Sequence, residues 1–409
     1  LAGRQMPSDP PKGGRMTNSP PSKVKLEHNE HARVLASGID SLVLALSVSW
    51  SDRSTFRKLA ALKTIAKQEK EDEPAELIIA NETSPWRFVV KPHGAGGFEW
   101  LITSQELGMK IGNWLEPQQR PSVMVDIRSE TLWAHGPEGV VNRILALIEG
   151  LGGEVVEVKV SRLDLCVDTL IRSENWTKGL IDSFVSRARK MHTHYQSREL
   201  SGFSIGKGKL RARLYDKPME IKAKSKKTWM YDIWGIETVG DENRVVRTEF
   251  QLRREALLEL GMGEWKTVLN FHHMIWGYCA TMWLKLVDDA SLHHTQQQLL
   301  PWWNVVESGF HGIQNAEPLV RDRSVHLDKR QLAAQAIGSL SSLLSIDLSP
   351  TELESGDKLD RESHLLLALK EALNNINYGD EEFTRRMRRK QAKHHRSGPD
   401  FHEPAFDTD

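Results

Sequence analysis

Charged side chains recur at every second position in three short stretches of this chain, and one stretch also carries a tyrosine. The stretches are SRLDLCVD (161–168), KLRARLYDK (209–217) and VVRTEFQLRR (245–254). Because successive side chains of a β-strand point to opposite faces, each stretch predicts a strand with one apolar and one charged face. The charged faces would carry Arg162, Asp164 and Asp168 on the first strand, Arg211, Arg213, Tyr215 and Lys217 on the second, and Arg247 and Glu249 on the third.

Alternation of this kind is routine in half-buried strands, so alone it does not indicate a site. Aspartate, however, is depleted in strands, and two aspartates on one face need a partner such as a divalent cation. A tyrosine hydroxyl beside metal-bound carboxylates could attack a phosphodiester and hold the product covalently. The arginines and the lysine would steady the phosphate and lower the pKa of Tyr215. The pattern favours phosphodiester transesterification with Mg²⁺ or Mn²⁺; a structural strand tyrosine is the alternative.

The segments around these stretches predict an α+β fold, with an antiparallel sheet backed by helices and a helical C-terminal extension. Period-two and period-3.6 apolar patterns carry this prediction. Further strands are expected at 38–50 and 121–129 with a hairpin over 87–102, and helices at 53–69, 137–150, 176–190, 254–260 and 265–290. The segments 122–168 and 176–254 would be the two halves of one catalytic sheet.

Composition shifts divide the chain into five parts. Residues 1–33 are rich in Pro, Ser and Lys and predict a disordered leader. We expect an N-terminal α+β part of the core at 34–121, the catalytic core at 122–322, a helical accessory region at 323–380, and a basic then acidic flexible tail at 381–409.

Charge and cysteine usage narrow the class of protein. Lys plus Arg equals Asp plus Glu, 55 each, yet residues 207–227 hold nine basic residues against two acidic ones. Two cysteines argue against a disulfide framework or a cysteine-rich zinc site, which fits a reducing compartment. No run of 18 apolar residues and no signal pattern occurs, so we expect a cytoplasmic protein without membrane contact.

An ordered set of short motifs resembles the replication initiation factor family of the Rep_trans type. The motifs are Gly38-Ile39-Asp40, SRLDLCVD, GFSIGKGKLRARLYDK-x-x-E, VRTEFQLRRE and Pro301-Trp302-Trp303, in that order over residues 35–310. This family groups rolling-circle initiators of plasmids and phages with relaxases of conjugative elements. The leader and the C-terminal region are not covered by the resemblance.

The resemblance implies a metal-dependent endonuclease that nicks and joins DNA at an origin. On that reading Tyr215 is the nucleophile that forms a 5′-phosphotyrosine, assisted by Lys217 and Arg213. The metal ligands would come from Asp164, Asp168 and Glu249, with Glu220 a further candidate and Asp40 another that could belong. The residues expected to contact DNA are Arg162, Arg211, Arg247, Lys207 and Lys209. A host helicase would be a partner, and a homodimer stays open.

Three alternatives remain open from the sequence. A relaxase would use the same chemistry in conjugative transfer, whereas a non-catalytic origin or operator DNA-binding regulator would keep only the basic face. An RNA-binding protein ranks last, because the exposed face lacks a matching aromatic pair beside Tyr215. A histidine pair of the kind that binds metal in other rolling-circle nickases is approximated by His192-Thr193-His194, in which case Tyr195 would compete as nucleophile.

Overall fold

The computed structural model describes residues 23–24, 30–68, 75–79, 85–310, 333, 336–343, 361–375, 383–385 and 387. The chain divides into two compact units, Leu1–Val320 and Arg321–Asp409. The second unit contains a helical segment at 336–343 and helix α11, which confirms the expected helical character of the C-terminal part. Most of the expected tail at 381–409 lies outside the described residues.

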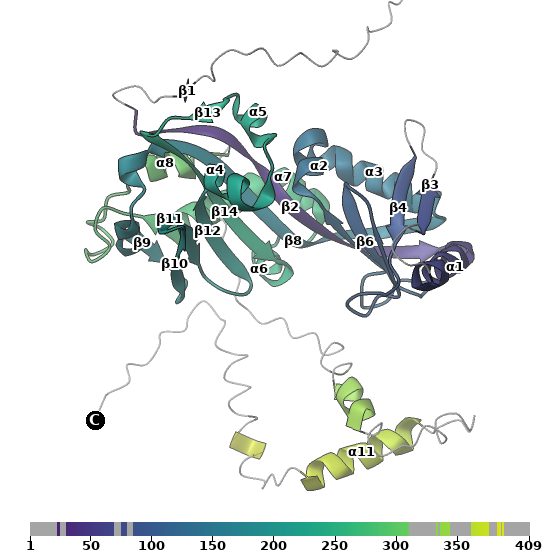
Figure 1. Cartoon of the computed structure of the whole chain (residues 1–409). Helices are drawn as coiled ribbons and strands as arrows, with labels where there is room; N and C mark the ends of the chain where they lie inside the picture. The colour runs from purple at the N-terminus through teal and green to yellow at the C-terminus, as the bar shows by residue number, and fades with distance from the viewer. Residues whose placement is uncertain are drawn as a thin grey trace, which may run out of the picture. The chain divides into compact units, whose positions relative to one another are not determined.

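An eleven-stranded sheet forms the first unit, and every neighbouring pair in it is antiparallel. The strand order is β10-β11-β12-β14-β8-β2-β7-β6-β5-β4-β3. Its strands are β2 (Ala32–Trp50), β3 (Glu76–Ile79), β4 (Trp86–Val90), β5 (Trp100–Thr103), β6 (Leu107–Ile111), β7 (Val123–Ile127), β8 (Gly153–Arg172), β10 (Met191–Gln196), β11 (Glu199–Ile205), β12 (Leu210–Asp216) and β14 (Asn243–Arg253). Two further sheets each pair two strands: β1 (Lys23–Val24) with β13 (Thr238–Val239), and β9 (Phe184–Ser186) with β15 (Leu284–Leu286). The α+β antiparallel prediction is therefore confirmed (Figure 1).

Helices cover both faces of the sheet (Figure 1). The helices of the first unit are α1 (Ser54–Gln68), α2 (Ser129–His135), α3 (Pro137–Gly150), α4 (Lys217–Glu220), α5 (Met230–Trp234), α6 (Arg254–Glu259), α7 (Trp265–Gly277) and α8 (Pro301–Glu307). Helix α11 (Arg361–Asn375) belongs to the second unit. Short 3₁₀ turns lie at Ser173–Asn175 and Lys178–Ser183, and π-helical turns at Ile221–Ser225 and Tyr278–Trp283.

The apolar faces of β8, β12 and β14 share one core with the tryptophans of α7 and α8. Phe250 of β14 lies edge-on to Trp276 of α7, with ring centroids 5.1 Å apart, and Trp302 and Trp303 of α8 are buried in the same core. Burial of several indole rings supplies much of the apolar area that stabilises this half of the sheet. The charged faces of these strands consequently point to the opposite side of the sheet.

Three sequence predictions need correction. The expected helix at 176–190 is absent: Lys178–Ser183 forms a 3₁₀ turn, and Phe184–Ser186 pairs with β15. The expected helix at 265–290 ends at Trp283, where the chain becomes β15. Inside the expected disordered leader, Lys23–Val24 forms a parallel pair with Thr238–Val239. In the first two cases tertiary strand pairing overrides apolar spacing that would also suit a helix.

Among the described residues, no helix combines the length and the apolar character needed to cross a membrane.

Candidate active site

The three charged stretches lie side by side as β12, β14 and β8, with β14 in the middle. Tyr215 is opposite Arg247, and Arg247 is opposite Asp168. Two residues along the strands, on the same face, Arg213 is opposite Glu249. Directly opposed residues of an antiparallel pair point to the same face, so the charged side chains converge on one surface.

Tyr215 stands at the end of β12 because the next residue terminates the strand. The Asp216 carboxylate accepts a hydrogen bond from the Met219 backbone N–H at 2.8 Å and so caps α4, whose first turn contains Pro218. Aspartate is a preferred N-cap, and proline suits the first helical turn. On the other side of Tyr215, its partner on β11 is Gly202, where an added Cβ would lie 2.8 Å from the tyrosine Cβ. The ring of the half-buried Tyr215 is thus held at a strand end beside a position without a side chain.

Glu249 links the tyrosine to a basic residue. The Tyr215 hydroxyl donates to Glu249 Oε2 at 3.0 Å, and the Arg213 guanidinium pairs with Oε1 of the same carboxylate. Arg213 Nη2 also lies 3.9 Å from Asp164 Oδ2, and Arg162 Nε donates to Asp164 Oδ1 at 2.8 Å. Two carboxylates, two arginines and one phenol therefore form a continuous polar cluster.

Burial sets the protonation states in this cluster. Burial raises the pKa of Asp164 to about 7; the charge of Glu249 adds to the effect, and hydrogen bonds from Arg162 oppose it. The pKa of Tyr215 is raised well above its ordinary value of 10.0, first by burial and then by Glu249, with Arg247 and Arg213 acting against the rise. The expected lowering of the tyrosine pKa is thus wrong. Tyr215 is a neutral phenol at neutral pH, and Glu249 is the acceptor in contact with its proton.

Asp164 and Glu249 are the carboxylates that fit a divalent cation best. They lie on adjacent strands, they contact the same arginine, and the charge of Glu249 helps to raise the pKa of Asp164; a cation would relieve that repulsion. Within the described ranges, no group of three or more His, Cys, Asp or Glu side chains is arranged to hold a metal ion. The structure therefore brings together two of the four predicted ligands.

Asp168, by contrast, belongs to a buried ion pair. Arg247 is completely buried; its Nε and Nη2 donate to the two carboxylate oxygens of Asp168 at 2.6 and 2.7 Å. The Trp234 indole N–H donates to Asp168 at 2.8 Å. These contacts replace the metal and phosphate contacts predicted for Asp168 and Arg247, because α5 covers this part of the charged face.

Asp40 closes the same ion-pair network from β2. The β2–β8 register shifts between Ile39 and Ser41, so Asp40 is the extra residue of a β-bulge, a feature that redirects a side chain. Its carboxylate accepts from Arg247 Nη1 at 2.8 Å and from the Ser129 hydroxyl at 2.8 Å. Burial acts to raise the pKa of Asp40, but nearby cations, Arg247 foremost, hold it well below its ordinary value.

Glu220 and Lys217 pair with each other. Lys217 is buried, and its Nζ donates to Glu220 Oε2 at 2.7 Å; the Ser225 hydroxyl donates to the same oxygen at 3.0 Å. The ammonium also lies 5.5 Å from the centroid of the Tyr215 ring. Lys217 therefore touches the tyrosine ring face and has little access to a phosphate, and Glu220 is occupied by two donors.

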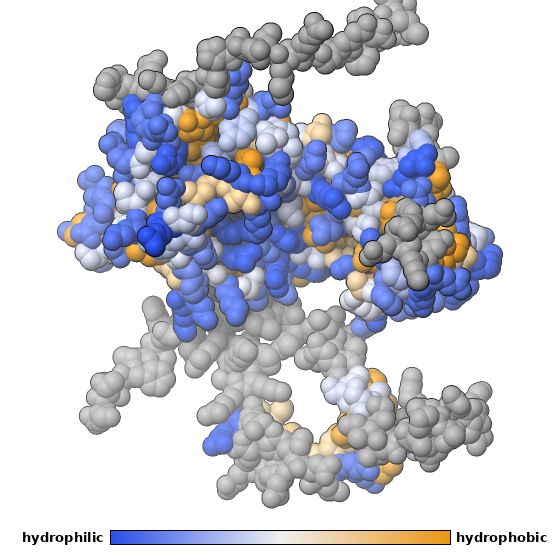
Figure 2. All heavy atoms as spheres, viewed as in Figure 1, coloured by the Kyte–Doolittle hydropathy of each residue, from blue (hydrophilic) through white to orange (hydrophobic). Residues whose placement is uncertain are grey.

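The remaining predicted DNA-binding residues divide by their surroundings. Arg211 donates to Gln251 Oε1 at 2.5 Å beside the cluster, and the Arg162 side chain is 36% exposed. Lys207 and Lys209 lie on the exposed β11–β12 turn, and Lys209 pairs with Glu259 at 2.6 Å. On the face that Figure 2 shows, hydrophilic residues predominate over this half of the sheet. The sequence prediction did not assign three exposed lysines on the turn after α4: Lys222, Lys224 and Lys226.

The histidine pair lies on the edge strand β10. His194 is opposite Gly202, which is in turn opposite Tyr215, so His194 shares the face of the tyrosine two strands away. Its Nε2 is 2.8 Å from the Ser204 hydroxyl. Tyr195, the competing nucleophile, is 56% exposed on the same strand.

A cavity of about 440 Å³ opens over Tyr215. Its lining includes Arg211, Arg213, Glu220 and His194, so basic and acidic groups from β10, β12 and α4 line the same cavity as the phenol. The sequence could not reveal Gly202 or Trp234 as contributors, because neither carries chemistry that spacing would single out.

Comparison with models of protein families, with curated proteins and with solved structures finds no match to this chain.

Proposed function

We propose that this protein is a tyrosine-based, metal-dependent DNA nicking and joining endonuclease that initiates rolling-circle replication of a plasmid-like or phage-like element. The observation that carries the proposal is the hydrogen bond from the Tyr215 hydroxyl to Glu249, beside Arg213 and beneath an open cavity. A phenol, an adjacent base and a cation for the phosphate are the groups that this transesterification needs.

The reaction exchanges one phosphodiester bond for another. Glu249 takes the proton of Tyr215 as the phenolic oxygen attacks phosphorus, which matters because the raised pKa keeps the phenol neutral. The bond from phosphorus to the 3′ oxygen breaks, the 3′ oxygen takes a proton from solvent, and the 5′ phosphate stays on Tyr215. Joining reverses these steps with a 3′-hydroxyl as the nucleophile.

Arg213 and Arg162 are the cations best placed for the phosphate, since both lie beside Asp164 and their side chains are 38% and 36% exposed. Asp164 and Glu249 would hold the Mg²⁺ or Mn²⁺ ion, which supplies charge neutralisation at the phosphate. Arg211 and the exposed Lys224 after α4 extend this positive surface along the cavity, as expected for a groove that follows a single strand.

A relaxase of a conjugative or mobilisable element would use the same residues in the same chemistry. A non-catalytic origin or operator regulator would need only the basic surface, and the Tyr215–Glu249 contact would then have no role beyond structure. The Tyr215–Glu249 contact favours the enzyme. We further propose DNA as its substrate and a host helicase as a partner.

The test uses supercoiled DNA that carries the protein's own locus, with Mg²⁺ or Mn²⁺. We expect nicked circles with protein attached to the 5′ end. Tyr215→Phe should abolish attachment, whereas Tyr195→Phe, an identical change at an exposed position, should leave it intact. Wild-type protein that binds this DNA without nicking it would favour the regulator, and attachment that persists in Tyr215→Phe but is lost in Tyr195→Phe would identify the other tyrosine.

A further inference from the structure

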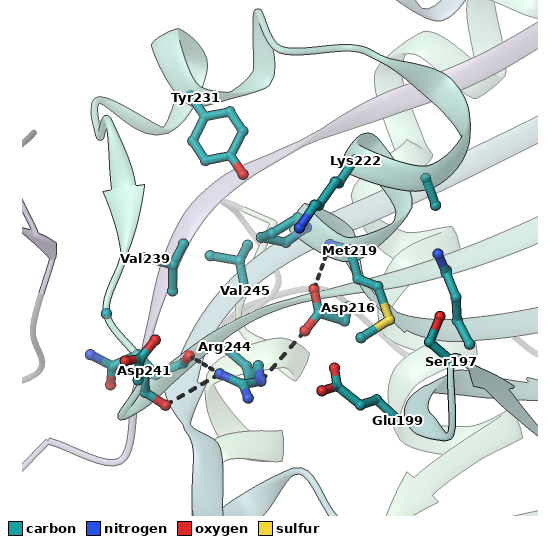
Figure 3. Close-up of a pocket in the computed structure, with 15 residues that line it drawn as sticks. Ser197, Glu199, Asp216, Met219, Lys222, Tyr231, Val239, Asp241, Arg244 and Val245 are labelled. Carbon is teal, nitrogen blue, oxygen red and sulfur yellow. Dashed lines mark hydrogen bonds and ion pairs between the residues drawn. The ribbon is translucent and has the colours of Figure 1, made fainter.

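A second cavity, of about 610 Å³, lies where β12 leaves the sheet (Figure 3). The β12–β14 ladder stops at the pair Asp216 and Val246, so the part of β14 that precedes Val246 borders this space on the side where β12 would continue. The walls come from α4, α5, β13 and the β10–β11 turn. This size falls within the usual range for a small-molecule site.

The second cavity adjoins the one that contains Tyr215. Gln196, Asp216 and Ala223 line both. A single strand whose phosphate faces Tyr215 would therefore bring a neighbouring nucleotide to the mouth of the second cavity. Enzymes that act on nucleic acid often hold an unstacked base in such a pocket.

Arg244 is anchored as a donor in the wall of the second cavity. Its Nη1 donates to the backbone carbonyls of Asp241 and Asn243 at 3.2 and 2.9 Å, and its Nε lies 3.5 Å from Asp216 Oδ2. The side chain is still 39% exposed. A guanidinium held in this way loses little further entropy when it binds a planar group.

Acceptors lie close to this donor. Asp216 is buried and Glu199 is exposed, and both carboxylates line the same cavity as Arg244. The Tyr231 hydroxyl points toward the other lining residues, and Lys222 also lines the cavity (Figure 3). Guanine presents O6 and N7 as acceptors and its N1–H and amino group as donors, so an arginine with a carboxylate matches it better than any other base.

We propose that this second cavity binds a guanine base of the DNA strand, next to the phosphate that Tyr215 attacks. The inference rests on the proposed function for the position of that phosphate, but base binding itself does not require nicking.

The test measures binding by fluorescence anisotropy, without divalent metal and at fixed salt. The probes are labelled oligothymidylates of about 12 nucleotides with one central dG, dA, dC or dT. We expect the dG probe to bind about tenfold more tightly, the scale of one good bidentate contact. Affinities that agree within about twofold across the four probes would overturn the inference.

Variants separate base recognition from general charge. Arg244→Lys keeps the charge but loses the fork, so it should remove the dG preference while leaving affinity for the dT probe nearly unchanged. Arg87→Ala, at an exposed arginine on β4, should keep the preference. A dG preference that survives in Arg244→Lys would overturn the assignment.

Two further measurements are needed. One distinguishes a base of the strand from a free nucleotide, and the other distinguishes the guanine site from the proposed nuclease. Free dGMP should compete only weakly; dGMP that binds more tightly than the dG probe would identify a free nucleotide site and overturn the strand assignment. Tyr215→Phe should retain the full preference, because the phenol is not part of the second cavity. A dG preference in a protein that never nicks DNA would refute the nuclease while supporting the guanine site.

Discussion

The buried carboxyl group of Asp164, close to Glu249, predicts an unusual pH dependence of the free energy of unfolding. Asp164 is 1% exposed, and its pKa rises from the ordinary 3.8 to about 7 in the folded protein. Between these values the folded state binds more protons than the unfolded state, so the free energy of unfolding falls as pH rises through this window. The full shift corresponds to roughly 4 kcal/mol, and we expect to observe ~2–4 kcal/mol because Arg162 and Arg213 can rearrange around the charge.

The perturbation is Asp164→Asn, and the assay is urea unfolding at several values between about pH 4.5 and pH 8. Asparagine cannot ionise, so the variant lacks the penalty that the wild-type protein gains with rising pH. Other buried acids contribute in both proteins; Glu307, whose pKa burial raises to about 7, is one. The difference between the two proteins therefore isolates Asp164, and Asp126→Asn, at an exposed position of β7, controls for the substitution itself.

Metal binding should appear in the same experiment. Millimolar Mg²⁺ at the upper pH is expected to stabilise the wild-type protein, since a ligand that binds only the folded state raises its unfolding free energy, and to leave Asp164→Asn almost unchanged. Parallel pH curves for wild type and Asp164→Asn would show that this carboxyl is not the titrating group. Equal stabilisation of both proteins by Mg²⁺ would exclude Asp164 as a ligand.

Two further predictions concern the support of the site. Arg247→Ala should lower the unfolding free energy by about 3–5 kcal/mol in urea, because it leaves Asp168 buried without its cation, while Arg87→Ala, at an exposed side chain of β4, should change it by less than about 0.5 kcal/mol. Gly202→Ala should cost about 1–3 kcal/mol by thermal unfolding, because the new Cβ would lie 2.5 Å from a backbone oxygen of β12. Gly139→Ala, in a helix and with open space around it, should instead be neutral or stabilising; equal effects of the two glycine changes would contradict the packing argument.

Strand alternation predicted the charged face because it depends only on local geometry. The three stretches became neighbouring strands, and a turn at Gly206 and Gly208, both with positive φ, joins β11 to β12. The start of α3 at Pro137 followed from its position after Gly136. What failed was the assignment of apolar segments without a capping signal: residues 176–190 form turns and a strand because Phe184 finds a partner across the chain.

Local pattern could not predict what covers the charged face. Asp164 and Asp168 lie four residues apart on the same face of β8, yet Asp164 joins the cluster with Arg162 and Arg213, and Asp168 is enclosed by α5. That difference is set by the segment after β12, which folds back over the sheet because Asp216 caps α4. It is a tertiary contact between residues far apart in the chain, and no periodicity encodes it.

The charged face therefore has two parts with different physics. The enclosed part, around Arg247, holds ion pairs whose donors and acceptors satisfy one another, so its value is to fix the register of β2, β8 and β14. The open part, around Tyr215 and Glu249, contains two buried carboxylates, Asp164 and Glu249, whose negative charges repel each other near the cavity over Tyr215. Strain of this electrostatic kind is costly in a purely structural site, because protein interiors normally neutralise it. A ligand that brings positive charge would relieve this repulsion, and a metal-bound phosphodiester is such a ligand.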